Sequence, residues 1–293
     1  MTIPAVSTDL RGWLWRCSAG LVLLGAWLLA GCAAPPPAAA APGSKEPVVN
    51  GPVTSTGTKD HITQSDETDA SRRAQVRLEL AGAYFGRGQM TTALDEVKKS
   101  IAADPNVSGA FNLRGLIYAS LGDHRLAEES FRRALQIDPR DADSMQNFGW
   151  YLCQQSRFSE ANVLFLQALA VPQYQDSPRT LLTQGICQAR SGKNDEAERT
   201  LVRAYALEPG NPAIAVNLSE VLYRRGDLER ARFYIRRVNS VPNLVSPQTL
   251  WLAARIENKF GNPAGVADFG GQLRNRFPES PESTAYVEGR FNE

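Results

Sequence analysis

The sequence is poor in histidine and cysteine, and its charges nearly cancel. Its 293 residues include two histidines, four cysteines, and 32 basic against 31 acidic side chains, for a formal net charge of +1. His61 and His124 alone offer little material for a histidine-rich metal site or a Ser-His-Asp triad. The absence of a CxxC pair argues against redox and zinc motifs. The balanced charge gives no reason to expect nucleic acid as a partner.

The apolar run from Ala19 to Ala30 follows Arg11 and Arg16. A membrane-spanning helix needs about 20 apolar residues, and this run is shorter. A short apolar run behind positive charge at the N-terminus is typical of a cleaved signal peptide. We therefore predict a signal peptide over residues 1–31, with an uncleaved membrane anchor as the alternative.

The residues Leu29-Ala30-Gly31-Cys32 resemble the lipobox of bacterial lipoproteins. That resemblance implies that the Cys32 thiol is lipidated and becomes the mature N-terminus, with acyl chains such as palmitate anchoring the protein. Ala33 follows in place of the aspartate that favours inner-membrane retention in enterobacterial lipoproteins. The expected location is the periplasmic face of the outer membrane. We expect no cofactor other than this covalent lipid.

Residues 32–70 are rich in alanine, proline, glycine, serine and threonine, and lack Phe, Trp and Tyr. Such a segment cannot bury enough apolar surface to offset the entropy of ordering it. We predict a disordered tether that spans roughly 30–35 Å and holds a domain away from the membrane.

Beyond residue 71 the chain repeats itself. Alanines within helical patterns recur at a nearly constant interval, each preceded by glycine or serine five positions earlier. A helix–turn–helix that recurs about every 34 residues, as this one does, is the tetratricopeptide pattern. Glycine suits the turn because it adopts a left-handed backbone at little cost. The aligned pairs are Gly88 and Ala93, Gly122 and Ala127, Ser156 and Ala161, Gly192 and Ala197, and Gly226 and Ala231.

The fold class predicted from this pattern is all-α, a tetratricopeptide-repeat solenoid forming a right-handed superhelix with a concave groove. The last repeat is degenerate, because Val266 and Gly270 stand where alanine and an aromatic residue are expected. Residues 281–293 form a C-terminal tail, either a last polar helix or a frayed end. Within 71–280 we place six repeats at about 74–107, 108–141, 142–177, 178–211, 212–246 and 247–280.

The first helix of each repeat should line the groove, where a peptide or protein is the expected ligand. No spacing assembles a nucleophile, a base and an oxyanion hole, so we expect neither an enzyme nor a small-molecule substrate. About half of the candidate groove residues could instead only pack against the adjacent repeat. The candidates are Asn112, Leu116, Gln146, Asn147, Trp150, Leu182, Ile186, Asn217, Glu220, Tyr223 and Trp251.

Cys153 and Cys187 lie one repeat length apart, in the first helices of adjacent repeats. In the oxidising periplasm, cysteines on neighbouring helices favour a disulfide. Two alternatives remain: the cysteines are small buried hydrophobic residues, or helix geometry keeps their Cα atoms too far apart.

The segments Asn147–Cys153 (NFGWYLC) and Gly185–Cys187 (GIC) go beyond a generic repeat. Together with the lipobox and six repeats, they resemble the type IV pilus biogenesis and stability lipoproteins, the pilotins of the type IVa pilus. The resemblance implies an adaptor that binds the pilus secretin and promotes its outer-membrane localisation and multimerisation. Pilus biogenesis and twitching motility would depend on it. The long tether and the weak sixth repeat depart from the family pattern and leave the span of the binding surface open.

A general periplasmic repeat lipoprotein that recruits envelope-assembly or peptidoglycan-processing proteins is the alternative. The two cysteine segments favour the pilotin, since a generic adaptor has no need of them. An enzyme with an active site in the groove would need converging titratable groups, and the groove candidates offer only Glu220.

Overall fold

The computed structural model describes residues 64–292, with side chains from Asp69 onward. The predicted signal peptide, the lipidation site Cys32 and most of the predicted tether therefore lie outside the described residues. Between 64 and 292 the chain forms thirteen α-helices and no strand. They are α1 (Gln64–Gly86), α2 (Met90–Ala103), α3 (Ser108–Leu121), α4 (His124–Ile137), α5 (Ala142–Gln154), α6 (Phe158–Ala170), α7 (Ser177–Arg190), α8 (Asn194–Leu207), α9 (Pro212–Arg225), α10 (Leu228–Asn239), α11 (Pro247–Lys259), α12 (Pro263–Arg276) and α13 (Pro281–Val287).

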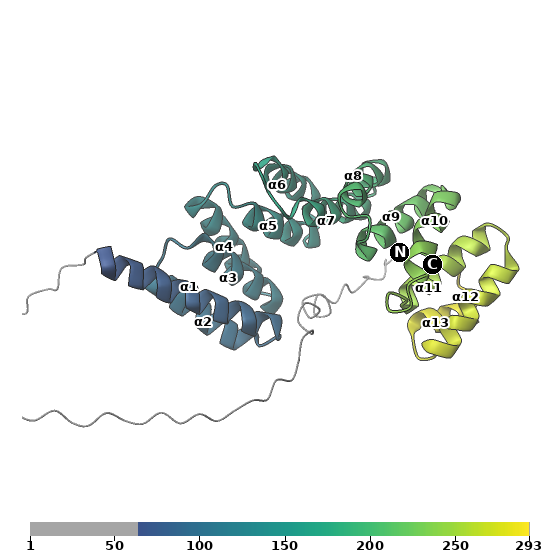
Figure 1. The fold of residues 1–293 in the computed structure, drawn as a ribbon, viewed down its shortest axis with the longest axis horizontal. Helices are drawn as coiled ribbons and strands as arrows, with labels where there is room; N and C mark the ends of the chain where they lie inside the picture. Colours follow the sequence, from purple (N-terminus) through teal and green to yellow (C-terminus); the bar gives the residue numbers. More distant parts are fainter. Residues whose placement is uncertain (1–63, 293) are drawn as a thin grey trace, which may run out of the picture.

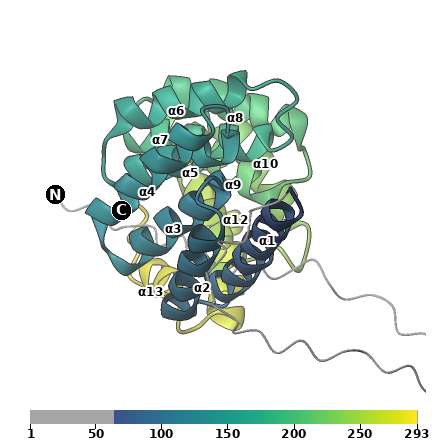
Figure 2. The ribbon, with the colours of Figure 1, turned by 90° about the vertical axis from the view of Figure 1, so that its left-hand side faces the viewer.

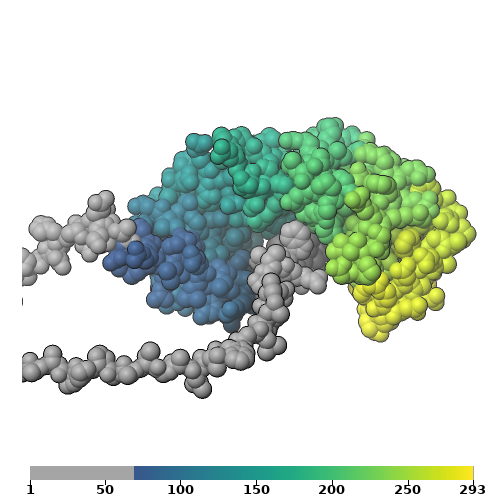
Figure 3. Space-filling model, in the orientation of Figure 1, coloured from purple at the N-terminus to yellow at the C-terminus, as the bar shows by residue number. Residues whose placement is uncertain are grey.

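Successive helices pack as six hairpins, which stack into an arch (Figure 1). The first helices of neighbouring hairpins touch one another and form the inner layer, while α6, α8 and α10 lie on the outer edge. Seen end-on, the hairpins wind round a common axis (Figure 2). The space-filling view shows a continuous body hollowed on the inner side of the arch (Figure 3). The predicted all-α tetratricopeptide-repeat solenoid is confirmed.

Close approach of the two helices in a hairpin depends on glycine in the first helix. A Cβ atom at Gly115 would lie 2.8 Å from the ring of Phe131, and one at Gly149 would lie 2.9 Å from the ring of Phe165. Real Cβ atoms do not approach this closely, so a side chain would force the helices apart. The regular spacing of these glycines thus reports a packing requirement.

Each hairpin turns through a residue with a left-handed backbone. Gly122 and Gly226 have φ of +80° and +82°, as their positions in the repeat predict. Ser156 occupies the same position in the third repeat and has φ of 61°, although it carries a Cβ. In two hairpins an aspartate caps the following helix: the Asp123 side chain accepts a hydrogen bond from the Leu126 amide, and Asp227 accepts one from the Arg230 amide.

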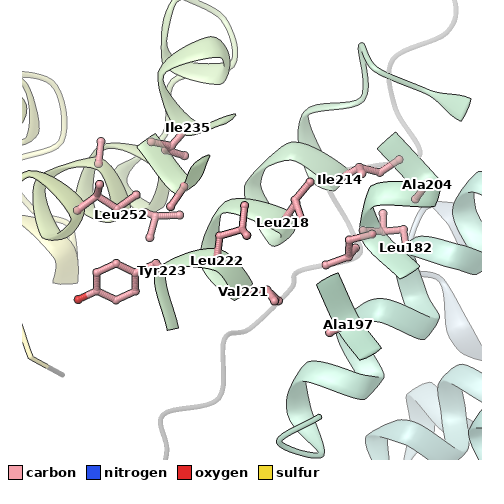
Figure 4. Close-up of a cluster of buried hydrophobic side chains, with 14 of the residues drawn as sticks. Leu182, Ala197, Ala204, Ile214, Leu218, Val221, Leu222, Tyr223, Ile235 and Leu252 are labelled. Atoms are coloured by element: carbon pink, nitrogen blue, oxygen red, sulfur yellow. The ribbon is translucent and has the colours of Figure 1, made fainter. Parts of the chain in front are cut away.

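The hydrophobic core runs along the solenoid between the helix layers. In the cluster around α9, Leu218 and Leu222 are fully buried and meet Ile235 of α10 and Leu252 of α11 (Figure 4). Burying a leucine or isoleucine side chain contributes about 1.5–3 kcal/mol. Because the buried residues of the three larger clusters each come from two or three repeats, every repeat depends on its neighbours for its core.

The N-terminal end of the repeat array differs from the sequence prediction, and the C-terminal tail forms a last helix, one of its two predicted alternatives. Helix α1 begins at Gln64, inside the predicted tether of 32–70, because residues 64–70 lack proline and glycine and can extend the helix. At the other end, α13 packs on α11 and α12. A side chain at Gly270 would collide with the ring of Tyr286. The aromatic residue missing from the sixth repeat is thus supplied by the tail.

Among the helices between residues 64 and 292, none combines the length and the apolar character needed to cross a membrane.

Candidate partner-binding surface

A polar track crosses the inner layer from α3 to α7. The Asn147 side-chain amide donates to Oδ1 of Asn112 at 3.3 Å, and Arg179 donates to Oδ1 of Asn147 at 3.5 Å. All three side chains are at least partly exposed. They retain further donors and acceptors, which an extended peptide backbone could use. Arg179 was not among the predicted residues, although it follows Asn147 by close to one repeat length.

Apolar groups lie beside this track. Leu116 and Trp150 are partly exposed and pack on the cluster that contains Phe148 and Phe165. Ile186 is likewise partly exposed and packs on the neighbouring cluster. Each of these three side chains therefore has both roles considered in the sequence analysis: part of it packs against the core, and the rest is exposed to solvent. A partner could bury the remaining area of the Trp150 ring.

Gln146, Leu182 and Tyr223 were predicted to face the groove, and this prediction is wrong for the described conformation. Gln146 is 2% exposed, Leu182 7% and Tyr223 3%. Leu182 and Tyr223 belong to the cluster shared by several repeats. The Tyr223 ring is also covered by Arg255 and Lys259 of α11, at 4.6 and 4.1 Å from its centroid. The side chains of Leu182 and Tyr223 thus stabilise the contact between repeats and are not available to a ligand in the groove.

Asn217 and Glu220 are partly exposed, but their polar atoms already have partners within α9. The Asn217 amide donates to the Ala213 carbonyl at 2.8 Å. Glu220 accepts from Arg224, one helical turn away, at 3.0 Å. A ligand would have to compete with these local bonds.

Trp251 lies at the C-terminal end of the inner layer and is covered in part by the tail. The Phe291 ring stands 5.1 Å from the Trp251 ring, centroid to centroid, at an interplanar angle of 32°. Arg255 Nε donates to the Phe291 carbonyl oxygen at 3.4 Å. The sequence analysis did not anticipate Phe291 or Arg255. Arg255 follows Trp251 by one helical turn, and this spacing puts both on one helix face.

Cys153 on α5 and Cys187 on α7 form a disulfide, with Cα atoms 5.8 Å apart. Both cysteines are buried beside Phe148 and Phe165. The bond joins the third and fourth repeats near the middle of the inner layer. It therefore fixes the relative positions of Asn147 and Arg179, which extend from the same two helices.

Two perturbed titratable groups lie at the junction of the third and fourth repeats. Burial, together with the nearby charges of Asp176 and Asp141, raises the pKa of Asp143. Burial raises the pKa of Tyr174 to about 12, and its hydroxyl donates to Asp143 at 3.3 Å. The Thr180 hydroxyl also forms a hydrogen bond with the Tyr174 hydroxyl, at an oxygen–oxygen distance of 3.1 Å. Desolvation is the main cause of both raised pKa values, whereas the Tyr174 hydrogen bond lowers the pKa of Asp143 and the Thr180 contact lowers that of Tyr174. Over residues 69–292, no three His, Cys, Asp or Glu side chains are grouped to hold a metal ion.

Protein-family models for the tetratricopeptide repeat match residues 109–141, 142–171 and 188–241. These segments contain four of the left-handed turn residues, Gly122, Ser156, Gly192 and Gly226. The fold and the matches define the chain as a tetratricopeptide-repeat protein, a class that typically serves as scaffold or adaptor.

More specific relatives are proteins of the type IV pilus. The crystal structure of PilW, a widely conserved type IV pilus biogenesis factor, is 31% identical with a TM-score of 0.69 and covers 73% of this chain and 98% of its own. The type IV pilus assembly protein PilF of Pseudomonas aeruginosa is 26% identical over 234 residues, 80% of this chain and 91% of the relative. The structure of P. aeruginosa pilF shares the fold, with a TM-score of 0.67 at 23% identity. The chain belongs to the family of tetratricopeptide-repeat proteins of type IV pilus biogenesis.

Proposed function

We propose that the protein is a pilotin: a lipid-anchored adaptor that binds the type IV pilus secretin and promotes its outer-membrane localisation and multimerisation. The observation that carries the proposal is the kinship with PilW and PilF, which extends over nearly the full length of both relatives. The lipobox-like residues Leu29–Cys32 support the anchor. Pilus biogenesis and twitching motility would then depend on the protein through the secretin.

The inner layer is the surface we assign to the secretin. The polar track of Asn112, Asn147 and Arg179 offers hydrogen bonds to a peptide backbone, and Trp150 adds a rigid aromatic surface. The disulfide stiffens this region, so less entropy is lost when a partner binds. Each element is a general aid to protein recognition, and the proposal of the secretin as the partner rests on the resemblance to the pilotin family.

Binding between purified protein and the periplasmic domains of the secretin tests the assignment. We expect Trp150→Ala to weaken binding by roughly 30-fold, since a buried aromatic anchor at an interface contributes about 2 kcal/mol or more. Phe233→Ala is the matched control, because Phe233 is a 58% exposed aromatic residue on the outer helix α10. Loss of binding in the control but not in Trp150→Ala would contradict the assignment and show that the secretin binds the outer face of the arch.

The lipid anchor needs its own test. Mass spectrometry of the mature N-terminus should find acyl chains on Cys32, and membrane fractionation should place the protein with the outer membrane. Cys32→Ala should release it from that fraction. An unmodified Cys32 in a protein that restores pilus formation would overturn the anchor. A lipidated protein with no affinity for the secretin would instead favour a general envelope scaffold.

A further inference from the structure

The end of the chain folds back onto the inner layer of the arch. After α13, Gly289 turns the backbone with φ of +69°, and Phe291 stacks on Trp251. Arg255 donates a hydrogen bond to the Phe291 carbonyl oxygen. One aromatic side chain and one backbone carbonyl of an irregular segment are therefore held by α11, as a bound peptide would be.

The contact uses the helix face that corresponds to the predicted groove. Trp251, Arg255 and Lys259 follow one another at successive turns of α11, so their side chains lie on one stripe of the helix. Asn112 and Leu116 have the same spacing on α3 and are both partly exposed. The tail thus covers only the part of this stripe around Trp251 and Arg255.

The stripe is cationic from Arg255 onward. The Arg255 guanidinium and the Lys259 ammonium group share the face of the Tyr223 ring, at 4.6 and 4.1 Å from its centroid. Within residues 69–292, neither cation has a carboxylate at ion-pair distance. Two positive charges on one neutral ring create a site that attracts an anionic group. Helical turns are about 5.4 Å apart and an extended chain rises about 3.3 Å per residue, so that group should lie about one to three residues from the aromatic one.

The helix α13 is held in place chiefly by residues other than Phe291. The Tyr286 ring fills the space above Gly270, and Ser283 and Ala285 of α13 are buried. These residues close the C-terminal end of the solenoid. Phe291 lies after the turn at Gly289, where its ring meets the edge of the Tyr286 ring, 6.1 Å between centroids, and stacks on Trp251 of the inner layer.

We propose that the stripe of Trp251, Arg255 and Lys259 is a binding site for an extended peptide that carries an aromatic residue with an acidic residue close by. The chain's own segment Glu288–Asn292 occupies the aromatic part of this site until a partner displaces it. The inference does not rest on the identity of the pilus partner, because it concerns contacts within this chain.

A peptide with the sequence of residues 288–293, Glu-Gly-Arg-Phe-Asn-Glu, is the probe. A tail that covers the site nine-tenths of the time weakens the apparent affinity of a competitor about tenfold. The labelled peptide should therefore bind the Phe291→Ala protein at least about tenfold more tightly than the wild type. Binding should be lost when alanine replaces phenylalanine in the peptide, and when Trp251→Leu is added to the Phe291→Ala protein. Equal affinity for wild type and Phe291→Ala, or no binding to either, would overturn the proposal.

Thermal unfolding separates a binding site from a structural cap. Tyr286→Ala should lower Tm by about 5–10 °C, because it empties the space above Gly270. Phe291→Ala should leave Tm within about 2 °C of the wild type. A loss of Tm in Phe291→Ala as large as that in Tyr286→Ala would show that the tail is part of the cap, and would contradict a displaceable occupant.

Discussion

Gly115 on α3 lies directly against the ring of Phe131 on α4, at a distance that leaves no room for a Cβ atom. Gly115→Ala should therefore destabilise the protein by about 1–3 kcal/mol, the usual cost of overpacking a core. Gly82→Ala is the matched control, because Gly82 lies within α1 with no atom near the position of its missing Cβ. There alanine should stabilise by about 0.5–1 kcal/mol through helix propensity. Urea unfolding measures both, and equal effects of the two substitutions would refute this packing role.

Ser156 adopts a left-handed backbone that glycine adopts in the other hairpin turns. The conformation costs a residue with a Cβ about 1 kcal/mol or more, so Ser156→Gly should raise the free energy of unfolding by up to about 1 kcal/mol. The reciprocal change, Gly122→Ala, should lower it by a similar amount, since φ at Gly122 is +80°. Thermal melting of the two variants is the measurement. A destabilising Ser156→Gly would mean that the serine side chain contributes more than its backbone costs.

The disulfide between Cys153 and Cys187 closes a loop with a sequence separation of 34. On the chain-entropy model such a bond contributes about 3–4 kcal/mol. We expect the Cys153→Ala, Cys187→Ala double variant to unfold at a lower denaturant concentration, with a free energy of unfolding about 3–4 kcal/mol below that of the wild type. Reductant should destabilise the wild type and leave the double variant unaffected. Free thiols at both positions in protein purified from the source organism without reductant would contradict the bond.

Glu257 is 1% exposed and accepts hydrogen bonds from Arg232 at 2.7 Å, Arg236 at 2.9 Å and Asn262 at 2.7 Å. Burial alone would raise the pKa of this carboxyl, but hydrogen bonds from Arg232 and Asn262 and the charges of both arginines lower it below its ordinary 4.5. Glu257→Gln should therefore destabilise the protein by about 1.5–3 kcal/mol at pH 7.

The sign of the pH dependence follows from this lowered pKa. A carboxyl with a lower pKa in the folded state contributes its full stability above pH 4.5 and loses it as pH falls through the folded-state value. The difference between wild type and Glu257→Gln in unfolding free energy should thus shrink as the pH falls below 4.5. Asp95→Asn, at an exposed position on α2, is the control for the loss of a negative charge and should leave the unfolding free energy at pH 7 close to that of the wild type. A constant difference between wild type and Glu257→Gln down to low pH would contradict the shift.

The sequence predicted those features that depend on local chemistry. The roles of Gly115 and Gly122 follow from the repeat spacing, because close helix contact and a left-handed turn each demand a particular residue type. Exposure at the groove was harder to predict, since periodicity fixes the helix face but not how far a neighbouring repeat covers it. Tyr223 was assigned to the surface for this reason, although the adjacent repeat buries it.

Contacts of the tail could not be predicted from periodicity at all. Phe291 reaches back to Trp251 from beyond the last repeat, after the short helix α13 and a turn that no repeat pattern describes. The replacement of a missing aromatic at Gly270 by Tyr286 is similar: the sequence reveals the gap, and only the three-dimensional path of the chain shows what fills it.

As proposed above, this protein carries the pilus secretin to the outer membrane and promotes its assembly there. The most direct test is a deletion strain of the source organism, complemented with wild-type or Cys32→Ala protein, in which heat-resistant secretin multimers are quantified in the outer-membrane fraction. We predict that the multimers and surface pili are lost in the deletion strain, restored by the wild type and restored poorly by Cys32→Ala. Normal multimers and normal pili without the protein would contradict the claim.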